Sequence, residues 1–156
     1  MEKVLTKLNQ LKSGKVGIII YSQLKQEILL SFNKDLKVPL ASVAKVALAF
    51  CIAKMVEERR FEWTDTVGNI SFNPEEDSNK VYPHFQSREN LALQDAVEVM
   101  IACHDSFVAE SVVQFCGGWE IINNKMKSYF KNITITQNPR DLNNIGKLSE
   151  TLELSD

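Results

Sequence analysis

A serine and a lysine three residues apart are the side chains in this sequence best suited to covalent chemistry. Ser42 and Lys45 stand where a polar segment gives way to the apolar run 46–53. Residues three apart share one face of a helix, so the amine of Lys45 can reach the hydroxyl of Ser42. A serine attacks well only when a base takes its proton, and a lysine acts as that base only when burial and nearby positive charge favour its neutral form.

The segment after Ser42 has the pattern of a core helix, which would bury the amine. We predict a helix from about Ser42 to Glu58 that is apolar on nearly every face. Its apolar members are Val43, Val46, Leu48, Phe50, Cys51, Ile52 and Met55. The alternative interpretation is structural, with Ser42 as the N-cap of this helix and Lys45 as a solvated residue of its first turn.

An N-terminal helix and a β-hairpin are predicted before this core helix. Apolar residues recur at helical spacing from Val4 to Leu11. The β-branched run 16–21 is typical of a buried strand, and residues 27–32 are typical of its partner. Left open, the first strand would present a long apolar sheet edge, which soluble proteins usually cover. A second chain, a second copy of this chain or further residues of a longer protein would have to cover it.

A polar connection and a series of helices are predicted downstream. The connection spans residues 69–90, and helices follow over residues 92–103, 106–116 and 119–130. Asn138, Pro139 and Asp141 have the residue types that open a further helix. The prediction is an α+β fold, mostly helical with an incomplete sheet, in a single domain over residues 1–156.

Composition restricts the class of protein. The chain has 156 residues, of which 44% are apolar and 24% charged, as in an ordinary globular domain. A net charge of −2, a pI near 5.8 and the absence of a basic strip argue against a nucleic-acid partner. No apolar run reaches the ~20 residues of a membrane span, and the N-terminus lacks a signal-peptide pattern. We therefore expect a cytoplasmic chain as given, or an exported one if a signal has been removed.

The cysteines favour buried thiols over a metal site or a disulfide. Cys51, Cys103 and Cys116 each lie within an apolar helical pattern, and their number is odd. Cys103, His104 and Asp105 are consecutive, so on a helix they diverge by about 100° each and do not converge on one ion. We expect neither a metal nor a cofactor.

Longer stretches of the chain resemble the class A β-lactamases, within the superfamily of serine β-lactamases and penicillin-binding proteins. The phrase from Val38 to Lys45 resembles the family's nucleophile motif at the start of its core helix. Residues 91–101 resemble the helix that leads into the family's Ser-Asp-Asn triplet, and Gly117-Gly118 resembles the end of the next helix. Residues 139–142 resemble the start of the helix after the family's Ω-loop. The resemblance covers most of the chain.

The triplet itself departs from the family pattern. Only its aspartate is kept, as Asp105, with His104 in the serine place and Ser106 in the asparagine place. The resemblance implies catalytic roles for Ser42, Lys45 and His104, since an imidazole can replace the serine as a general acid. A histidine without a catalytic role is the alternative. Asp105 and Ser106 are expected to be structural.

Two further parts of the family pattern have no counterpart. Between residues 133–136 and Asn138 there is no room for an Ω-loop, so the deacylating glutamate is missing. No Lys-Thr-Gly occurs, and Gly146-Lys147 lies in a pattern that predicts helix. The resemblance also places an aromatic residue of the polar connection against the substrate. Tyr82 is the candidate for that role, and an ordinary packed tyrosine is the alternative.

The resemblance implies a serine hydrolase that forms an acyl-enzyme with β-lactams or related amides and peptides. Because the Lys-Thr-Gly strand supplies one N–H of the oxyanion hole in the family, we expect weak activity or acylation without turnover. A second hypothesis is a non-catalytic binding or scaffold protein that pairs through its open strand edge. A third is a small helical adaptor in which Ser-x-x-Lys is a coincidence.

Overall fold

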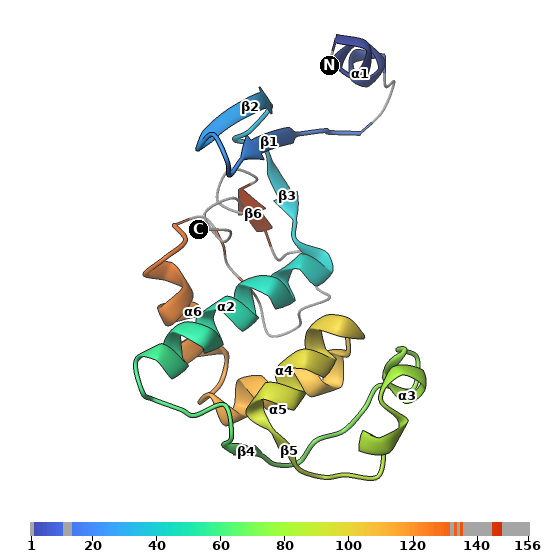
Figure 1. Cartoon of the computed structure of the whole chain (residues 1–156), viewed down its shortest axis with the longest axis vertical. Helices are drawn as coiled ribbons and strands as arrows, with labels where there is room; N and C mark the ends of the chain where they lie inside the picture. Colours follow the sequence, from blue (N-terminus) through green and yellow to red (C-terminus); the bar gives the residue numbers. More distant parts are fainter. Residues whose placement is uncertain (1, 11–13, 132, 134, 136–144, 148–156) are drawn as a thin grey trace. The chain divides into compact units, whose positions relative to one another are not determined.

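The computed structural model describes residues 2–10, 14–131, 133, 135 and 145–147, and it confirms the predicted α+β class. The described part of the chain divides into two compact units, the first made of the residues up to Val38 together with Lys147 and the second made of residues between Pro39 and Gly146. Figure 1 labels the elements of both units. The first unit holds the N-terminal helix and a hairpin. The second unit holds the remaining helices and every residue to which the sequence assigns a catalytic role.

The first unit contains α1 (Glu2–Asn9), β1 (Ile18–Ser22) and β2 (Glu27–Phe32). The two strands form an antiparallel hairpin in which Ile18 pairs with Phe32, and a bulge interrupts the register between Ile20 and Tyr21. The predicted hairpin is therefore confirmed. The predicted end of the N-terminal helix at residues 11–13 lies outside the described residues.

The prediction that the first strand is buried is wrong. Ile20 in β1 is 42% exposed and Ile28 in β2 is 52% exposed, and every residue of β1 keeps some accessible surface. In the described part of the chain this sheet has two strands only. A two-stranded sheet gives its side chains few neighbours, so the apolar run forms a strand without becoming core.

A second two-stranded sheet corrects another prediction. β3 (Lys37–Pro39) pairs with β6 (Ile145–Lys147), so Gly146 and Lys147 lie in a strand and not in a helix. The local helical pattern is overridden here by backbone pairing with a segment more than a hundred residues earlier in the chain. The helix predicted to begin at residues 138–141 lies outside the described residues.

The predicted core helix is present with a different beginning. A short 3₁₀ helix, η1 (Ala41–Val43), leads directly into α2 (Ala44–Glu57). Seven residues of α2 are buried. Val46 in its first turn and Val43 in η1 are 47% and 50% exposed. The prediction that apolar side chains are buried on nearly every face of this helix is therefore wrong.

The polar connection contains more regular structure than the sequence predicts. It holds α3 (Ser78–Val81) and η2 (Pro83–Phe85), and it is flanked by β4 (Thr66–Val67) and β5 (Leu91–Ala92). β4 and β5 pair antiparallel, so the two ends of the connection lie side by side.

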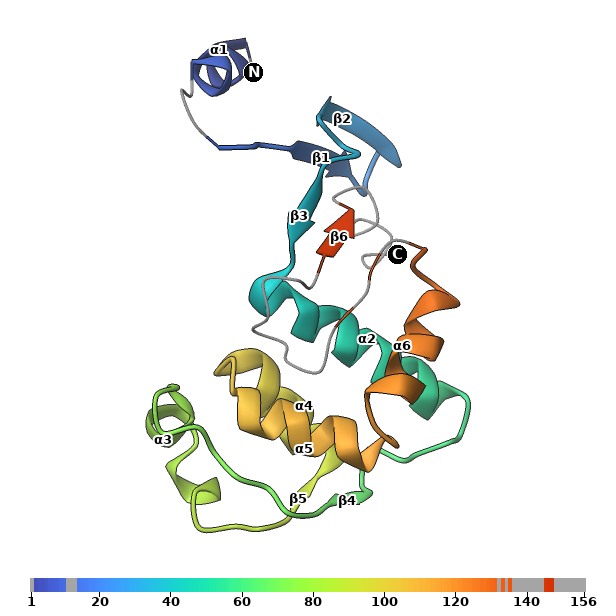
Figure 2. The same cartoon turned by 180° about the vertical axis from the view of Figure 1, so that it is seen from behind.

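Three helices complete the second unit close to their predicted positions. They are α4 (Leu93–Ala102), α5 (Ser106–Phe115) and α6 (Trp119–Lys127). α4 lies beside α5, and α2 packs against both α4 and α6 (Figures 1 and 2). Their facing residues form the core of this unit, which includes Leu48, Ile52, Met55, Leu93, Met100, Val108, Val112, Ile122, Met126 and Phe130.

The cysteines are free and buried, as predicted. Burial raises the pKa of Cys51 and of Cys116 to about 12, and it also raises the pKa of Cys103. Among the described residues, no group of histidine, cysteine and acidic side chains is arranged to hold a metal ion. No helix in the described part of the chain is long and apolar enough to cross a membrane.

These thiols should react slowly in the folded protein. A raised pKa keeps a thiol protonated at pH 8, and the thiolate is the reactive form. We expect almost no reaction of the native chain with a disulfide-exchange reagent at pH 8, and reaction of all three cysteines in guanidinium chloride. Rapid reaction of Cys51 or Cys116 in the folded state would contradict the buried placement.

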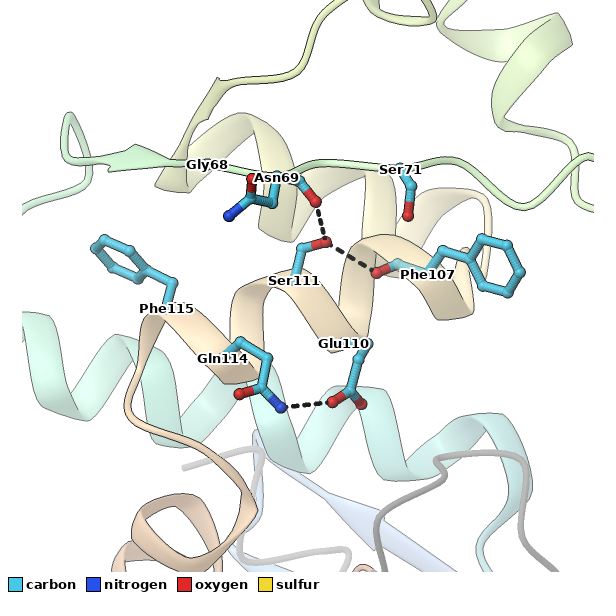
Figure 3. Close-up of a pocket in the computed structure, with 8 residues that line it drawn as sticks. All are labelled: Gly68, Asn69, Ser71, Phe107, Glu110, Ser111, Gln114 and Phe115. Carbon is cyan, nitrogen blue, oxygen red and sulfur yellow. Dashed lines mark hydrogen bonds between the residues drawn. The ribbon is translucent and has the colours of Figure 1, made fainter.

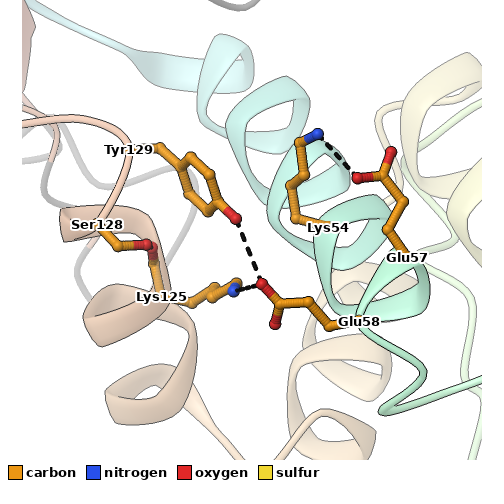
Figure 4. A network of polar contacts seen from close by, with 6 residues as sticks. All are labelled: Lys54, Glu57, Glu58, Lys125, Ser128 and Tyr129. Atoms are coloured by element: carbon orange, nitrogen blue, oxygen red, sulfur yellow. Dashed lines mark hydrogen bonds and ion pairs between the residues drawn. The ribbon is translucent and has the colours of Figure 1, made fainter.

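A polar network connects the end of α2 to α6 (Figure 4). Lys125 of α6 forms an ion pair with Glu58, the C-cap residue of α2. The Tyr129 hydroxyl donates to the same carboxylate at 3.4 Å, and the Lys125 amine lies 5.3 Å from the Tyr129 ring. The hydrogen bond from Lys125 lowers the pKa of Glu58, and the same bond raises the pKa of Lys125.

The network predicts a small stability change with pH. Glu58 has a lowered pKa when folded, so its contribution is present above the ordinary glutamate pKa and is lost as pH falls. Lys125 has a raised pKa when folded, so its contribution is lost as pH rises past the ordinary lysine pKa. We expect Glu58→Gln to lower Tm most near neutral pH and progressively less toward pH 3. Glu120→Gln on α6 is the matched control, and the same pH profile in both variants would contradict this assignment.

Candidate active site

Ser42 lies in η1, at a point where the backbone takes an unusual conformation. The preceding residue, Ala41, has φ of +44°, a region that residues with a Cβ seldom adopt. Such conformations are concentrated at functional sites, where the surrounding structure holds them in place. α2 begins after Ser42, with Val43 as its N-cap residue and no side-chain cap. The interpretation of Ser42 as the cap of this helix is therefore wrong.

Lys45 lies in the first turn of α2 and is 1% exposed. It is among the largest fully buried side chains of the described residues. The interpretation of Lys45 as a solvated first-turn residue is therefore wrong. Backbone of right-handed helical conformation runs through Val43 and Ala44, so Ser42 and Lys45 are one helical turn apart.

His104 is exposed, and it occupies the turn between α4 and α5. Its φ is +54°, in the left-handed region where histidine is found more often than most residues. This backbone conformation ends the path of α4 and allows the next residue to begin α5.

Asp105 is fully buried and holds this turn together. It is the N-cap residue of α5, and its carboxylate accepts from the N–H groups of Phe107 at 3.0 Å and Val108 at 3.1 Å. The same carboxylate accepts from the Asn73 N–H at 3.2 Å and from the Ser78 hydroxyl at 2.7 Å. Asp105 therefore joins the start of α5 to the polar connection.

Ser106 lies beside this cluster. Its hydroxyl oxygen accepts from the side-chain amide of Asn73 at 3.1 Å, and the amide oxygen of Asn73 accepts from the Glu75 N–H at 3.0 Å. Asn73 is itself buried. Ser106, like Asp105, is therefore hydrogen-bonded to a residue of the polar connection.

Tyr82 is held in place by two contacts. Its hydroxyl donates to the Glu98 carboxylate at 2.6 Å, and its ring stacks on Phe85 at 5.7 Å between centroids. The hydrogen bond to Glu98, with a smaller effect of burial, raises the pKa of Tyr82 to about 12. The side chain is therefore a fixed, neutral aromatic group at the end of α3.

Comparison of the sequence with known protein families identifies the family of this chain. The model of the beta-lactamase enzyme family matches residues 1–153. The chain belongs to the beta-lactamase enzyme family. No curated protein sequence matches it.

Solved structures share the fold of this beta-lactamase family member. A beta-lactamase from Chitinophaga pinensis matches with a TM-score of 0.80 at 17% identity, over 98% of this chain and 60% of that one. PBP-A matches with a TM-score of 0.78 at 17% identity, over 96% of this chain and 57% of PBP-A. Penicillin-binding protein D2 from Listeria monocytogenes, in its ampicillin-bound form, matches with a TM-score of 0.67 at 16% identity, over 89% and 59%. The chain thus spans less than two thirds of the length of each.

The sequence does not reveal the partners that fix the candidate residues of this family member. Asn73 and Ser78 bind Asp105 from 32 and 27 residues away, and Glu98 binds Tyr82 from 16 residues away. Asparagine and serine are ordinary residues of a polar connection, so their types give no signal of these contacts. A buried aspartate at an N-cap does signal that further donors must be found, because a buried carboxylate needs its hydrogen bonds.

Proposed function

We propose that this chain is a serine hydrolase of the β-lactamase and penicillin-binding type, in which Ser42 is acylated by β-lactams or related amides. The observation that carries the proposal is the 1% exposure of Lys45 one turn after Ser42. Burial disfavours the charged form of an amine, and a neutral amine beside a hydroxyl is the base that serine activation requires.

In the proposed step the Ser42 hydroxyl oxygen bonds to the substrate carbonyl carbon while Lys45 takes the hydroxyl proton. The C–N bond of the amide then breaks and an acyl-enzyme remains on Ser42. His104 is the proposed donor of the proton that the leaving nitrogen needs. This donation requires His104 to be protonated, and passage of the proton that Lys45 accepted to His104 then restores both side chains. The net step transfers the Ser42 hydroxyl proton to the leaving nitrogen and consumes no other reagent.

The other candidate residues have supporting roles in this proposal. Asp105 and Ser106 fix the turn that carries His104 through the hydrogen bonds to Asn73 and Ser78. Tyr82 is proposed to line the substrate site. Because no counterpart of the deacylating glutamate is recognised in the sequence, we propose that the acyl-enzyme of this chain turns over slowly.

The solved relatives support the substrate class. A mutant of PBP-A was solved as an acyl-enzyme complex with penicillin-G, and penicillin-binding protein D2 was solved with ampicillin bound. At 16–17% identity these structures share the fold, and the chemistry is extended to this chain as part of the proposal.

A labelling experiment tests the proposal. The chain, Ser42→Ala and the surface control Ser128→Ala are incubated with a fluorescent penicillin, denatured and separated on a gel. Covalent label is expected on the chain and on Ser128→Ala and is expected to be absent from Ser42→Ala. Absence of label from the unaltered chain at a large excess of the reagent would overturn the proposed function.

A non-catalytic binding role remains a second candidate, because the β1–β2 hairpin exposes apolar side chains. Ile20, Ile28 and Leu29 are 42%, 52% and 43% exposed. In this hypothesis a second copy or another chain adds a strand to the hairpin, as strand addition uses open sheet edges. Light scattering on the purified chain should then show a dimer or a bound polypeptide. A strict monomer would remove the motive for this candidate.

A further inference from the structure

The structure contains a pocket whose lining includes none of the six candidate residues of the proposed active site. It has a volume of about 640 Å³ and lies between α5 and the segment that follows β4. Small-molecule sites in proteins typically measure roughly 300–1,000 Å³, so the pocket has the size of a ligand site. Figure 3 shows Ser111 at its middle, with Asn69 and Ser71 along one side and Glu110 and Gln114 along the other.

Two phenyl rings mark the ends of the pocket. Phe107 and Phe115 lie at opposite ends in Figure 3. They are eight residues apart on α5, which corresponds to a rise of about 12 Å along the helix axis. A ring of a bound molecule can therefore contact one phenyl group while the rest of the molecule reaches the polar middle.

The pocket lining carries one negative charge, on Glu110, which neutral donors hold in place. Glu110 accepts from the Gln114 side-chain amide at 2.7 Å and from the Trp119 indole N–H at 3.0 Å. The ion pairs found in the described ranges do not include Glu110, and the pocket lining contains no lysine, arginine or histidine. Charges that are partly removed from water favour a counter-charge, so the pocket electrostatically selects a cation.

The neighbouring polar groups offer acceptors to such a cation. The Ser111 hydroxyl has one proton to donate, and the backbone carbonyl oxygens of Asn69 at 3.1 Å and Phe107 at 3.2 Å share it. The Gln114 amide nitrogen donates to Glu110, which leaves the amide oxygen of Gln114 as another acceptor. An ammonium group has three donors and no acceptor, which matches this set.

We propose that this pocket is a binding site for an arylalkylammonium compound, a small organic cation with an aromatic ring a few bonds from its nitrogen. The ammonium group binds the Glu110 carboxylate and the amide oxygen of Gln114, which lies on the same face of α5, and the aromatic ring packs on Phe107 or Phe115. The site goes beyond the proposed acylation of Ser42 and does not depend on it. An anionic penicillin is repelled by Glu110, so it is not the ligand of this pocket.

A charge series of ligands tests the proposal on the full chain. The probes are 4-phenylbutylamine, its neutral analogue 4-phenylbutanol and its anionic analogue 4-phenylbutyrate, measured by calorimetry and by backbone amide NMR shifts. We expect the amine to shift amides of residues 68–71 and 107–115, and the two other probes to bind about tenfold or more weakly, since charge-assisted hydrogen bonds are lost. Equal binding of all three probes, or shifts at other residues, would overturn the proposal.

Variants locate the charge that the proposal requires. Glu110→Gln should bind the amine about tenfold more weakly, whereas Glu120→Gln, which removes the same charge from α6, should bind it as the unaltered chain does. Amine binding that is unchanged in folded Glu110→Gln would overturn the assignment. If Glu110→Gln does not fold, Phe107→Ala and Phe115→Ala replace it as the test. At least one of these two variants should weaken binding of both the amine and the alcohol, and unchanged binding of both probes in both variants would overturn the proposal.

Discussion

Replacement of Asp105 by alanine should lower the free energy of unfolding by about 3 kcal/mol or more. The carboxylate is 0% exposed and accepts from four groups, which are the Asn73, Phe107 and Val108 N–H groups and the Ser78 hydroxyl. Loss of an N-cap alone costs about 1 kcal/mol, and each donor left buried without a partner adds about 1–3 kcal/mol before relaxation. Domains of this size are stable by only about 5–15 kcal/mol, so a large part of the total would be lost.

Chemical denaturation of the two proteins measures this effect. Asp77→Ala is the matched control, because Asp77 lies on the same connection but forms an exposed ion pair with Lys80. Asp77→Ala should lower the free energy of unfolding much less than Asp105→Ala does, since exposed ion pairs contribute little to stability. Ser78→Ala, which removes one of the four donors, should fall between the two. Equal midpoints for Asp105→Ala and Asp77→Ala would show that the buried network does not stabilise the turn.

Replacement of Lys45 by methionine should separate catalysis from folding. General base catalysis contributes about 10²–10⁴-fold, so we expect acylation of Ser42 by a penicillin to slow by about 10³-fold. Methionine has a similar length and fills irregular gaps in a protein core, so we expect Lys45→Met to remain folded.

The rate of acylation is followed by intact mass, and stability by denaturation of the same samples. Lys54→Met is the control from the same helix, because Lys54 lies on a more exposed face and pairs with Glu57 at 2.8 Å. It should acylate at the rate of the unaltered chain. An unchanged acylation rate in folded Lys45→Met would show that another group takes the proton of Ser42.

The features that the sequence predicts well are those set by local pattern. The spacing of Ser42 and Lys45 and the apolar run after them predict a helix that buries the amine, and the structure has α2 with Lys45 inside it. The hairpin is predicted from its β-branched run and the three later helices from their helical patterns, and all of them are present. The end of α6 at Lys127, earlier than the predicted Phe130, is an ordinary error at a helix boundary.

The features that the sequence does not predict depend on contacts between distant segments. Gly146 and Lys147 join β3 as a strand, although their local pattern predicts a helix. The strand run beginning at Val16 is apolar yet stays partly exposed, because burial depends on neighbours that local pattern does not specify. The partners of Asp105 come from a polar connection in which no residue type marks them. Long-range pairing is thus the part of the fold and of the site that one sequence leaves open.

Ser42 is the proposed nucleophile, and peptide mapping after reaction with a penicillin identifies the side chain that is acylated. The chain is incubated with penicillin G, digested and sequenced by mass spectrometry, with Ser42→Ala treated in parallel. We expect one equivalent of the intact penicilloyl group on the peptide that contains Ser42, and none in Ser42→Ala. An adduct on a different residue, or an unmodified Ser42 at a large excess of penicillin, would contradict it.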